Sequence, residues 1–333
     1  MKNKNKIKLK FKKMPNLKQV GGNSMKHIKS MAAQLKKNKA YWIMLLPTLI
    51  YFIILAYLPM VGVYYAFTDY DYSKGLFGSK FVGMKNFDFL FHGGKNAIIW
   101  LLTKNTVVYN LEFLIIGTIS QVLVAVIISE LPGKLMKQLC QSLMFLPYFV
   151  SFVIVAVFAY NIFSDVGIAN ALIKKFGGHA INFYSTPGVW KYILNGVNVW
   201  KGIGYGTVMY LAALTAIDKT MYEAADLDGA NIFQRIWYIT LPSIRPTIVI
   251  LILFSIGGIV KGQFDMFYQL IGKNGTLYNA TDIIDTYVYR TLTVNFNVGI
   301  GTAAGLYQSV FGLILVVAVN KVVKTIEPDY ALF

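Results

Sequence analysis

Six long apolar stretches, separated by polar segments, dominate the hydrophobicity pattern of this 333-residue chain. Each is long enough to cross about 30 Å of hydrocarbon as a helix of about 20 residues. The pattern therefore predicts an all-α integral membrane protein with six transmembrane helices. We place them at residues 42–67, 106–129, 140–163, 193–216, 246–261 (extended by a few flanking residues) and 301–322.

Lysine is concentrated before the first apolar stretch. Residues 1–40 contain 13 Lys and no Asp or Glu, so of the formal net charge of +17 the rest of the chain carries 17 − 13 = +4. A basic segment directly before a first span stays in the cytoplasm, near anionic lipid headgroups. We therefore expect a basic cytoplasmic tail at 1–40, a membrane domain at 41–333 and both termini in the cytoplasm. We expect contact with membrane lipid and none with nucleic acid.

Residues 218–246 form a polar segment between the fourth and fifth apolar stretches, and the six-span topology places it in the cytoplasm. It is predicted to form two short helices. Thr220 and Glu223 have the spacing of a capping box at the start of the first helix. Gly229 can take the left-handed conformation that ends it.

The second short helix is expected to begin at Asn231. Gln234, three residues later, completes a second set of capping residues. Pro242 and Pro246 are expected to end this helix, because proline lacks the backbone N–H that continues the ladder.

The same segment resembles the EAA-x3-G-x9-I-x-LP loop of ABC importer permeases. The matching residues, with one acid that can bond to a partner surface, are Glu223, Ala224, Ala225, Asp228, Gly229, Ile239, Leu241 and Pro242. The resemblance implies a type I ABC importer permease fold, in which this loop is the coupling helix and sits in a groove of a separate ATPase subunit. The alternative is an ordinary amphipathic loop between spans.

Further segments, among them FVGMKNF, LPYFVSFVIVA and DIIDTYVYR, resemble carbohydrate-uptake permeases. This implies a subunit of the bacterial cell membrane that imports oligosaccharides or polysaccharide fragments. The implied partners are a second homologous permease, an ATP-binding subunit dimer and an extracytoplasmic substrate-binding lipoprotein. A secondary transporter or channel without an ATPase partner is the alternative. It would need an ion or proton relay, and Glu112 is the only acid deep in a predicted span.

The fourth predicted span combines aromatic rings with polar groups, and polar groups inside a membrane point to function. Aromatic faces can stack on sugar rings, while amides and ammonium groups can bond sugar hydroxyls. The candidate substrate-binding residues there are Asn198, Trp200, Lys201, Gly202 and Tyr205. Resemblance to maltose-type permeases matches the first, fourth and fifth of these and adds Lys261 and Gln263, near the end of the fifth span.

The charged groups in the spans leave alternatives open. Lys201 and Lys261 lie within a few turns of the outer face, where lysine side chains can extend to the headgroups. In a binding site, this pair would suit an acidic or bulky oligosaccharide. Glu112 is expected to hydrogen-bond a partner helix in preference to a substrate.

Three long connections are expected on the outer side, at about 68–104, 164–192 and 262–300. In the third, one helical face is predicted to carry Ile283, Ile284, Tyr287 and Val288. Such surfaces either receive a binding protein or pack over the outer mouth of the pore.

No catalytic, cofactor or metal site is expected. The chain has one cysteine, Cys140, and three histidines in separate polar segments. It lacks a Walker sequence, a nucleophile elbow and a His-Glu-x-x-His helix. With 56% hydrophobic and 14% charged residues, the composition is not that of a soluble domain. The resemblance to ABC permeases implies a pore-forming subunit, with ATP hydrolysis on a separate ATPase subunit.

Overall fold

The computed structural model describes residues 38–92, 94, 97–256 and 258–326. Secondary structure in these residues is almost entirely helical, and one antiparallel pair of two-residue strands accompanies the helices. Two elements, η1 and η5, are π-helical, whereas η2, η4 and η6 are 3₁₀ helices. The elements in chain order are α2 (Lys39–Phe52), η1 (Ile53–Tyr57), η2 (Leu58–Phe67), β1 (Thr68–Asp69), α3 (Gly75–Gly78), β2 (Lys80–Phe81), α4 (Lys85–Phe91), α5 (Ile98–Glu130), α6 (Lys134–Phe149), α7 (Phe152–Phe163), α8 (Ile168–Lys175), η4 (Phe183–Ser185), α9 (Pro187–Thr215), α10 (Lys219–Leu227), α11 (Ile232–Arg235), η5 (Ile236–Thr240), α12 (Leu241–Ile256), α13 (Phe264–Ile271), η6 (Gly275–Leu277), α14 (Tyr278–Thr281), α15 (Ile284–Thr293) and α16 (Val298–Ile326).

The chain divides into two compact units, Met1–Val61 and Gly62–Phe333. In the first unit, every residue from 38 to 61 is exposed, although most of them are apolar. A helix that is apolar on all sides and has no buried face is suited to hydrocarbon and not to water. The predicted tail at 1–40 lies almost wholly outside the described residues.

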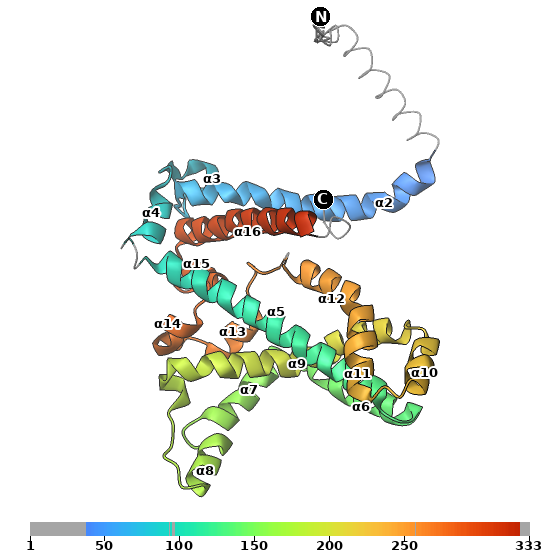
Figure 1. Ribbon diagram of the computed structural model, residues 1–333. Coiled ribbons are helices and arrows are strands. Elements are labelled where there is room, and N and C mark those ends of the chain that lie inside the picture. Colours follow the sequence, from blue (N-terminus) through green and yellow to red (C-terminus); the bar gives the residue numbers. More distant parts are fainter. Residues whose placement is uncertain (1–37, 93, 95–96, 257, 327–333) are drawn as a thin grey trace, which may run out of the picture. The chain divides into compact units, whose positions relative to one another are not determined.

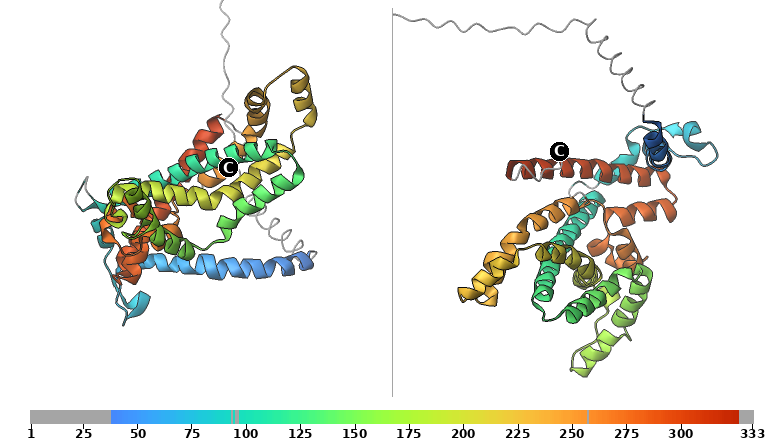
Figure 2. Two further views of the ribbon diagram at one scale, coloured as in Figure 1. Left: turned by 90° about the horizontal axis from the view of Figure 1, so that it is seen from below. Right: turned by 90° about the vertical axis from the view of Figure 1, so that its right-hand side faces the viewer.

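In the second unit, α5 and α9 pack side by side more extensively than any other pair of described elements (Figures 1 and 2). Glycine allows close contacts along α9. A Cβ atom added to Gly204 would lie 2.1 Å from the carbonyl oxygen of Met144 on α6. One added to Gly206 would lie 2.0 Å from the side-chain Cδ of Gln121 on α5. Glycines therefore permit α9 to sit directly against both neighbours.

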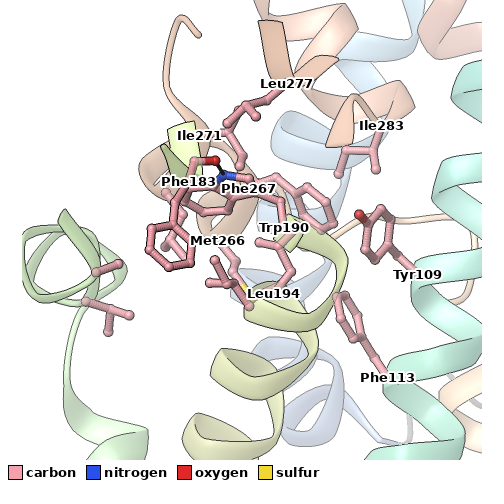
Figure 3. Close-up of a cluster of buried hydrophobic side chains, with 14 residues drawn as sticks. Tyr109, Phe113, Phe183, Trp190, Leu194, Met266, Phe267, Ile271, Leu277 and Ile283 are labelled. Atoms are coloured by element: carbon pink, nitrogen blue, oxygen red, sulfur yellow. Dashed lines mark hydrogen bonds between the residues drawn. The ribbon is translucent and has the colours of Figure 1, made fainter. Parts of the chain in front are cut away.

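The largest buried cluster joins α5, α7, α9 and α13, and Figure 3 shows its side chains. Tyr109, Phe113 and Phe267 contact one another with ring centroids 5.0–6.2 Å apart. Buried Trp190 donates its indole N–H to the Phe183 carbonyl oxygen at 2.8 Å. This cluster fixes the beginning of α9 against α5 and α13.

Bonds of Asp282 join α14 to α15 and tie both to α5. Arg290 donates to both carboxylate oxygens of Asp282, at 3.2 and 2.6 Å, and its guanidinium lies 4.1 Å from the ring centroid of Tyr278. Asn105 on α5 donates to the Asp282 carbonyl oxygen at 3.0 Å. The predicted helix here is confirmed, and of its expected apolar face Ile283 and Ile284 are buried, while Tyr287 and Val288 pack on a cluster with α16.

Within the described residues, five helical segments are long and apolar enough to cross a membrane: Lys39–Phe67, Ile98–Glu130, Phe152–Lys175, Ile232–Ile256 and Val298–Thr325. They overlap five of the six predicted spans. The third of them consists of α7 and α8, joined by a turn at residues 164–167. The remaining predicted span, 193–216, lies in the 29-residue helix α9, whose Lys, Asn and Gly residues lower its hydropathy.

The predicted helix at 140–163 is wrong in one respect, because it is two helices. Helix α6 ends at Phe149, and α7 begins at Phe152 after Ser151, whose hydroxyl accepts from the Ile154 N–H at 3.4 Å. A serine at this position offers the backbone an end cap in place of a continuing helix. The fifth predicted span also ends earlier than 261, since α12 stops at Ile256.

Candidate functional site

A polar cavity of about 500 Å³ lies between α5, α9, the junction of α6 with α7, and the turn that follows α12. Six of the seven predicted substrate-binding residues line it: Asn198, Lys201, Gly202, Tyr205, Lys261 and Gln263. Among the described residues of its wall there is no carboxylate. The cavity thus combines amides, hydroxyls and aromatic rings with two ammonium groups.

Trp200, the seventh, faces away from this cavity. It lines a separate apolar groove of about 580 Å³ between α7 and α9, together with residues such as Val155 and Ile193. At 3.6 residues per turn, Trp200 lies about 200° around the helix from Asn198. Helical periodicity alone separates the two residues, and the expectation grouped them by proximity in sequence.

Lys201 is held at the junction between α6 and α7. Its ammonium group donates to the carbonyl oxygens of Pro147 (3.3 Å), Tyr148 (2.8 Å) and Val150. It also lies 4.9 Å from the ring centroid of Phe152. These carbonyls belong to the last turn of α6 and its C-cap, where the helix ladder ends. Lys201 therefore caps α6 from α9, and neither extends to headgroups nor has an unused donor for a ligand.

Lys261 differs from Lys201 in its surroundings. It is exposed on the turn between α12 and α13, beside Gln263. No described residue accepts a hydrogen bond from its ammonium group. Of the two lysines in the cavity, Lys261 is the one whose donors are available to a ligand.

Tyr148 and Tyr205 stack on each other in the cavity wall. Their rings are stacked with centroids 5.2 Å apart and an interplanar angle of 14°. Sequence reasoning missed Tyr148, and it also missed Gln121, which donates to the Gly202 carbonyl oxygen at 3.3 Å. A search of the spans for uncharged polar residues, and not only for ionisable ones, would have found Gln121.

Glu112 lies outside the cavity and bonds to a neighbouring helix, as expected. Its carboxylate lies 2.5 Å from the ammonium group of Lys191 and accepts from Asn195 at 2.8 Å. Both partners are on α9, so this acid joins α5 to α9.

The polar segment 218–246 contains two short helices, but the first begins two residues earlier than its predicted cap implied. Asp218 is the N-cap of α10, and its carboxylate accepts from the Thr220 N–H at 3.0 Å. This bond lowers the pKa of the Asp218 carboxyl. The expected capping box of Thr220 and Glu223 is wrong, because Thr220 is already inside the helix. Gly229 follows with φ 75°, as predicted.

The second short helix begins as predicted but does not end at the prolines. Asn231 and Gln234 form the reciprocal capping box, with bonds of 2.9 and 2.7 Å. Helix α11 then continues through η5 into α12 without a break, so Pro242 and Pro246 are both in helical conformation. The π-helical turn before Pro242 changes the hydrogen-bond pattern where the proline N–H is missing. Figure 1 shows that the path from α11 to α12 is bent, as prolines cause.

A hollow of about 340 Å³ lies between α10 and the start of α11 and η5. The predicted coupling residues that line it are Ala225, Asp228, Gly229 and Ile239. Glu223, Ala224 and Pro242 are exposed elsewhere, and Leu241 packs on a buried cluster that includes Ile244. The segment therefore presents a concave surface flanked by exposed groups.

Arg235 ties this segment to the long helices, a role that sequence reasoning did not identify. Its guanidinium donates to Asp226 on α10 at 2.6 Å and lies 3.4 Å from the carboxylate of Glu130 at the end of α5. A displacement of α10 and α11 is thereby linked to α5.

Comparisons with known proteins agree with this architecture. A family model described as "Binding-protein-dependent transport system inner membrane component" matches residues 114–327. The chain is 37% identical to the "Polygalacturonan/rhamnogalacturonan transport system permease protein YteP" of Bacillus subtilis (strain 168), over 89% of this chain and 91% of that protein. It is 35% identical to "Protein LplB" of the same organism, over 90% of this chain and 93% of that protein.

Two solved structures also resemble the chain. One is a bacterial alginate ABC transporter in complex with an alginate pentasaccharide-bound periplasmic protein, with a TM-score of 0.77 and 32% identity over 88% of this chain and 97% of that chain. The other is a bacterial ABC transporter involved in the import of the acidic polysaccharide alginate, with a TM-score of 0.79 and 31% identity over 90% of this chain and 99% of that chain.

Proposed function

The chain belongs to the family of inner membrane components of binding-protein-dependent transport systems, and we propose that its polar cavity receives an acidic oligosaccharide. It is a multi-pass membrane protein, the permease subunit of an ABC importer for oligosaccharides or polysaccharide fragments. The composition of the cavity that contains Lys261 is the observation that supports an acidic oligosaccharide as the substrate. Its wall combines an available ammonium group with stacked tyrosines and has no described carboxylate to repel an acidic sugar.

The names of the relatives support the same substrate class. Polygalacturonan, rhamnogalacturonan and alginate, which those names mention, are acidic polysaccharides. A sugar carboxylate and the ammonium group of Lys261 would form a charge-assisted hydrogen bond, which is stronger than a bond between neutral groups.

We propose that α9, packed against α5 and α6, is also a membrane span, the fourth of six in chain order, and that both termini and residues 218–246 are cytoplasmic. The 13 lysines of residues 1–40 support this orientation. A span that borders a polar cavity tolerates the lysine and glycines of α9, since they face protein or water and not lipid.

The proposed partners follow from this orientation. A separate ATP-binding subunit occupies the concave surface of α10 and α11, and its closure moves α5 through Arg235. A second permease subunit completes the pore, and an extracytoplasmic binding lipoprotein delivers the substrate. The resemblance of residues 223–242 to the loop of ABC permeases supports the first partner, and the solved complex with a periplasmic protein supports the last.

Lys261→Gln is expected to weaken selectively the import of acidic sugars. Loss of a charge-assisted bond costs about 1.5–3 kcal/mol, so the KM for a galacturonate trisaccharide should rise at least about 10-fold. The measurement is uptake by the assembled importer, with its binding protein, in proteoliposomes. Arginine at 261 keeps the charge and should retain uptake. An unchanged KM in Lys261→Gln would contradict the proposal that the cavity receives an acidic oligosaccharide.

Tyr205→Ala is expected to reduce uptake about 5- to 20-fold, because it removes one of the two stacked aromatic rings that the cavity offers to a sugar ring. Trp200→Ala on the same helix is the matched control, since it removes an aromatic ring of the separate apolar groove. Uptake and basal ATP hydrolysis should be compared in proteoliposomes. Equal losses in the two variants would place the sugar outside the cavity.

A further inference from the structure

The turn that carries Lys261 is held on both sides by two residues outside the cavity wall. Gln308 on α16 donates to the Val260 carbonyl oxygen at 2.7 Å. Asp285 on α15 accepts from the Gly262 N–H at 2.8 Å. The same amide of Gln308 donates to Asp285 at 3.0 Å, so the two side chains act together. The two backbone groups that flank Lys261 are thus fixed to one small network.

Packing leaves this turn little freedom to move. A Cβ atom added to Gly262 would lie 2.3 Å from Ile283 Cδ1 and 2.7 Å from the Asp285 carboxylate. Val260 and Ile283 are buried on either side. Because Gly262 has no Cβ, the backbone next to Lys261 lies directly against the side chains of Ile283 and Asp285.

The Asp285 carboxylate has no ion pair with any described lysine or arginine. Burial raises its pKa, and the bonds from Gly262 and Gln308 and the charge of Lys261 oppose that shift. A largely buried carboxylate is costly unless its bonds compensate. Here those bonds come from the turn and from Gln308, which indicates that the Asp285 carboxylate holds the turn in place.

We propose that Asp285 and Gln308 are positioning residues, which hold the Lys261 ammonium group in the cavity by fixing the peptide groups on both sides of it. The inference rests on the proposed function for its substrate, an acidic oligosaccharide. It adds two residues, on α15 and α16, that set affinity for acidic sugars without touching them.

The first test is direct binding of trigalacturonate, and of its neutral methyl ester, to the purified assembled importer without binding protein. Asp285→Ala and Gln308→Leu should each raise the Kd for trigalacturonate about 5- to 10-fold and leave the Kd for the ester within about 2-fold. Asp285→Asn keeps an acceptor oxygen and should restore most of the affinity. A Lys261→Gln, Asp285→Ala double variant should be no weaker than Lys261→Gln alone, because coupled residues are not additive.

The second test does not depend on the substrate. In a Cys140→Ser background, Lys261→Cys should react with a charged methanethiosulfonate reagent at a rate that Asp285→Ala changes at least about 5-fold and Asp285→Asn does not. If trigalacturonate and its ester bind wild type equally, the acidic-substrate proposal fails, and the labelling rates still decide the positioning. If labelling and selectivity are unchanged in Asp285→Ala, or if only thermal stability falls, the positioning inference is overturned.

Discussion

Replacing Gly204 with alanine is expected to reduce sharply the amount of folded permease that can be recovered from membranes. The added Cβ would lie 2.1 Å from a carbonyl oxygen and 2.9 Å from the Phe145 Cα, both in the backbone of α6. A backbone cannot turn aside as a flexible side chain can, so α6 and α9 must separate. Overpacking costs about 1–3 kcal/mol, and we expect the upper end here, which corresponds to a fall in Tm of about 5–10 °C.

Gly196→Ala is the control for this prediction. Gly196 lies on the same helix, and a Cβ there would meet no atom within 4 Å. Alanine favours helix over glycine by about 1 kcal/mol, so this variant should match or slightly exceed wild-type stability. The measurement is thermal unfolding of detergent-solubilised protein, followed by size-exclusion chromatography. A Gly204→Ala protein as stable as Gly196→Ala would show that the α6–α9 contact is looser than described.

Glu223→Lys and Gly229→Asp are each expected to abolish uptake while the permease remains inserted. Glu223 is exposed and bonds to no described residue, so reversing its charge should leave the fold of the subunit intact. Gly229 lines the hollow between the two short helices, where an aspartate would place charge and volume. Both changes should also reduce co-purification of the ATP-binding subunit.

Lys219→Ala provides the matched control for the coupling segment, because it alters an exposed charge on the same helix but outside the motif. It should retain most of the uptake and of the bound ATP-binding subunit. Normal transport by either Glu223→Lys or Gly229→Asp would show that this segment does not couple the permease to an ATPase.

The sequence was sufficient for the features that depend on local patterns. The apolar stretches predicted helices that the structure contains, and the box of Asn231 and Gln234 and the left-handed Gly229 were predicted from residue type and spacing. Six of the seven predicted substrate-binding residues line the polar cavity. Trp200 was grouped with them by proximity in sequence, whereas helical periodicity turns its side chain to a separate groove.

Tertiary contacts explain what the sequence could not predict. Lys201 looks like a headgroup-seeking lysine until the carbonyls at the end of α6 are brought to it by the packing of α9. The side chains of Asp285 and Gln308 come from different helices and are 23 residues apart in the sequence, and neither residue belongs to a recognisable motif. The role of a polar side chain depends on which unsatisfied groups the fold places beside it, and spacing along the chain does not contain that information.

At the turn of residues 260–262, the bonds that hold the backbone in place do not depend on which side chain stands at position 261. Its bonds to Asp285 and Gln308 involve only main-chain groups, so the residue at 261 contributes nothing to them beyond its Cα. Position 261 can therefore be exchanged without breaking these main-chain bonds, and only the electrostatic contribution of Lys261 to Asp285 is lost. A single codon change there, to glutamine for neutral sugars, is a route by which an importer of this architecture changes its substrate class, in nature or by design.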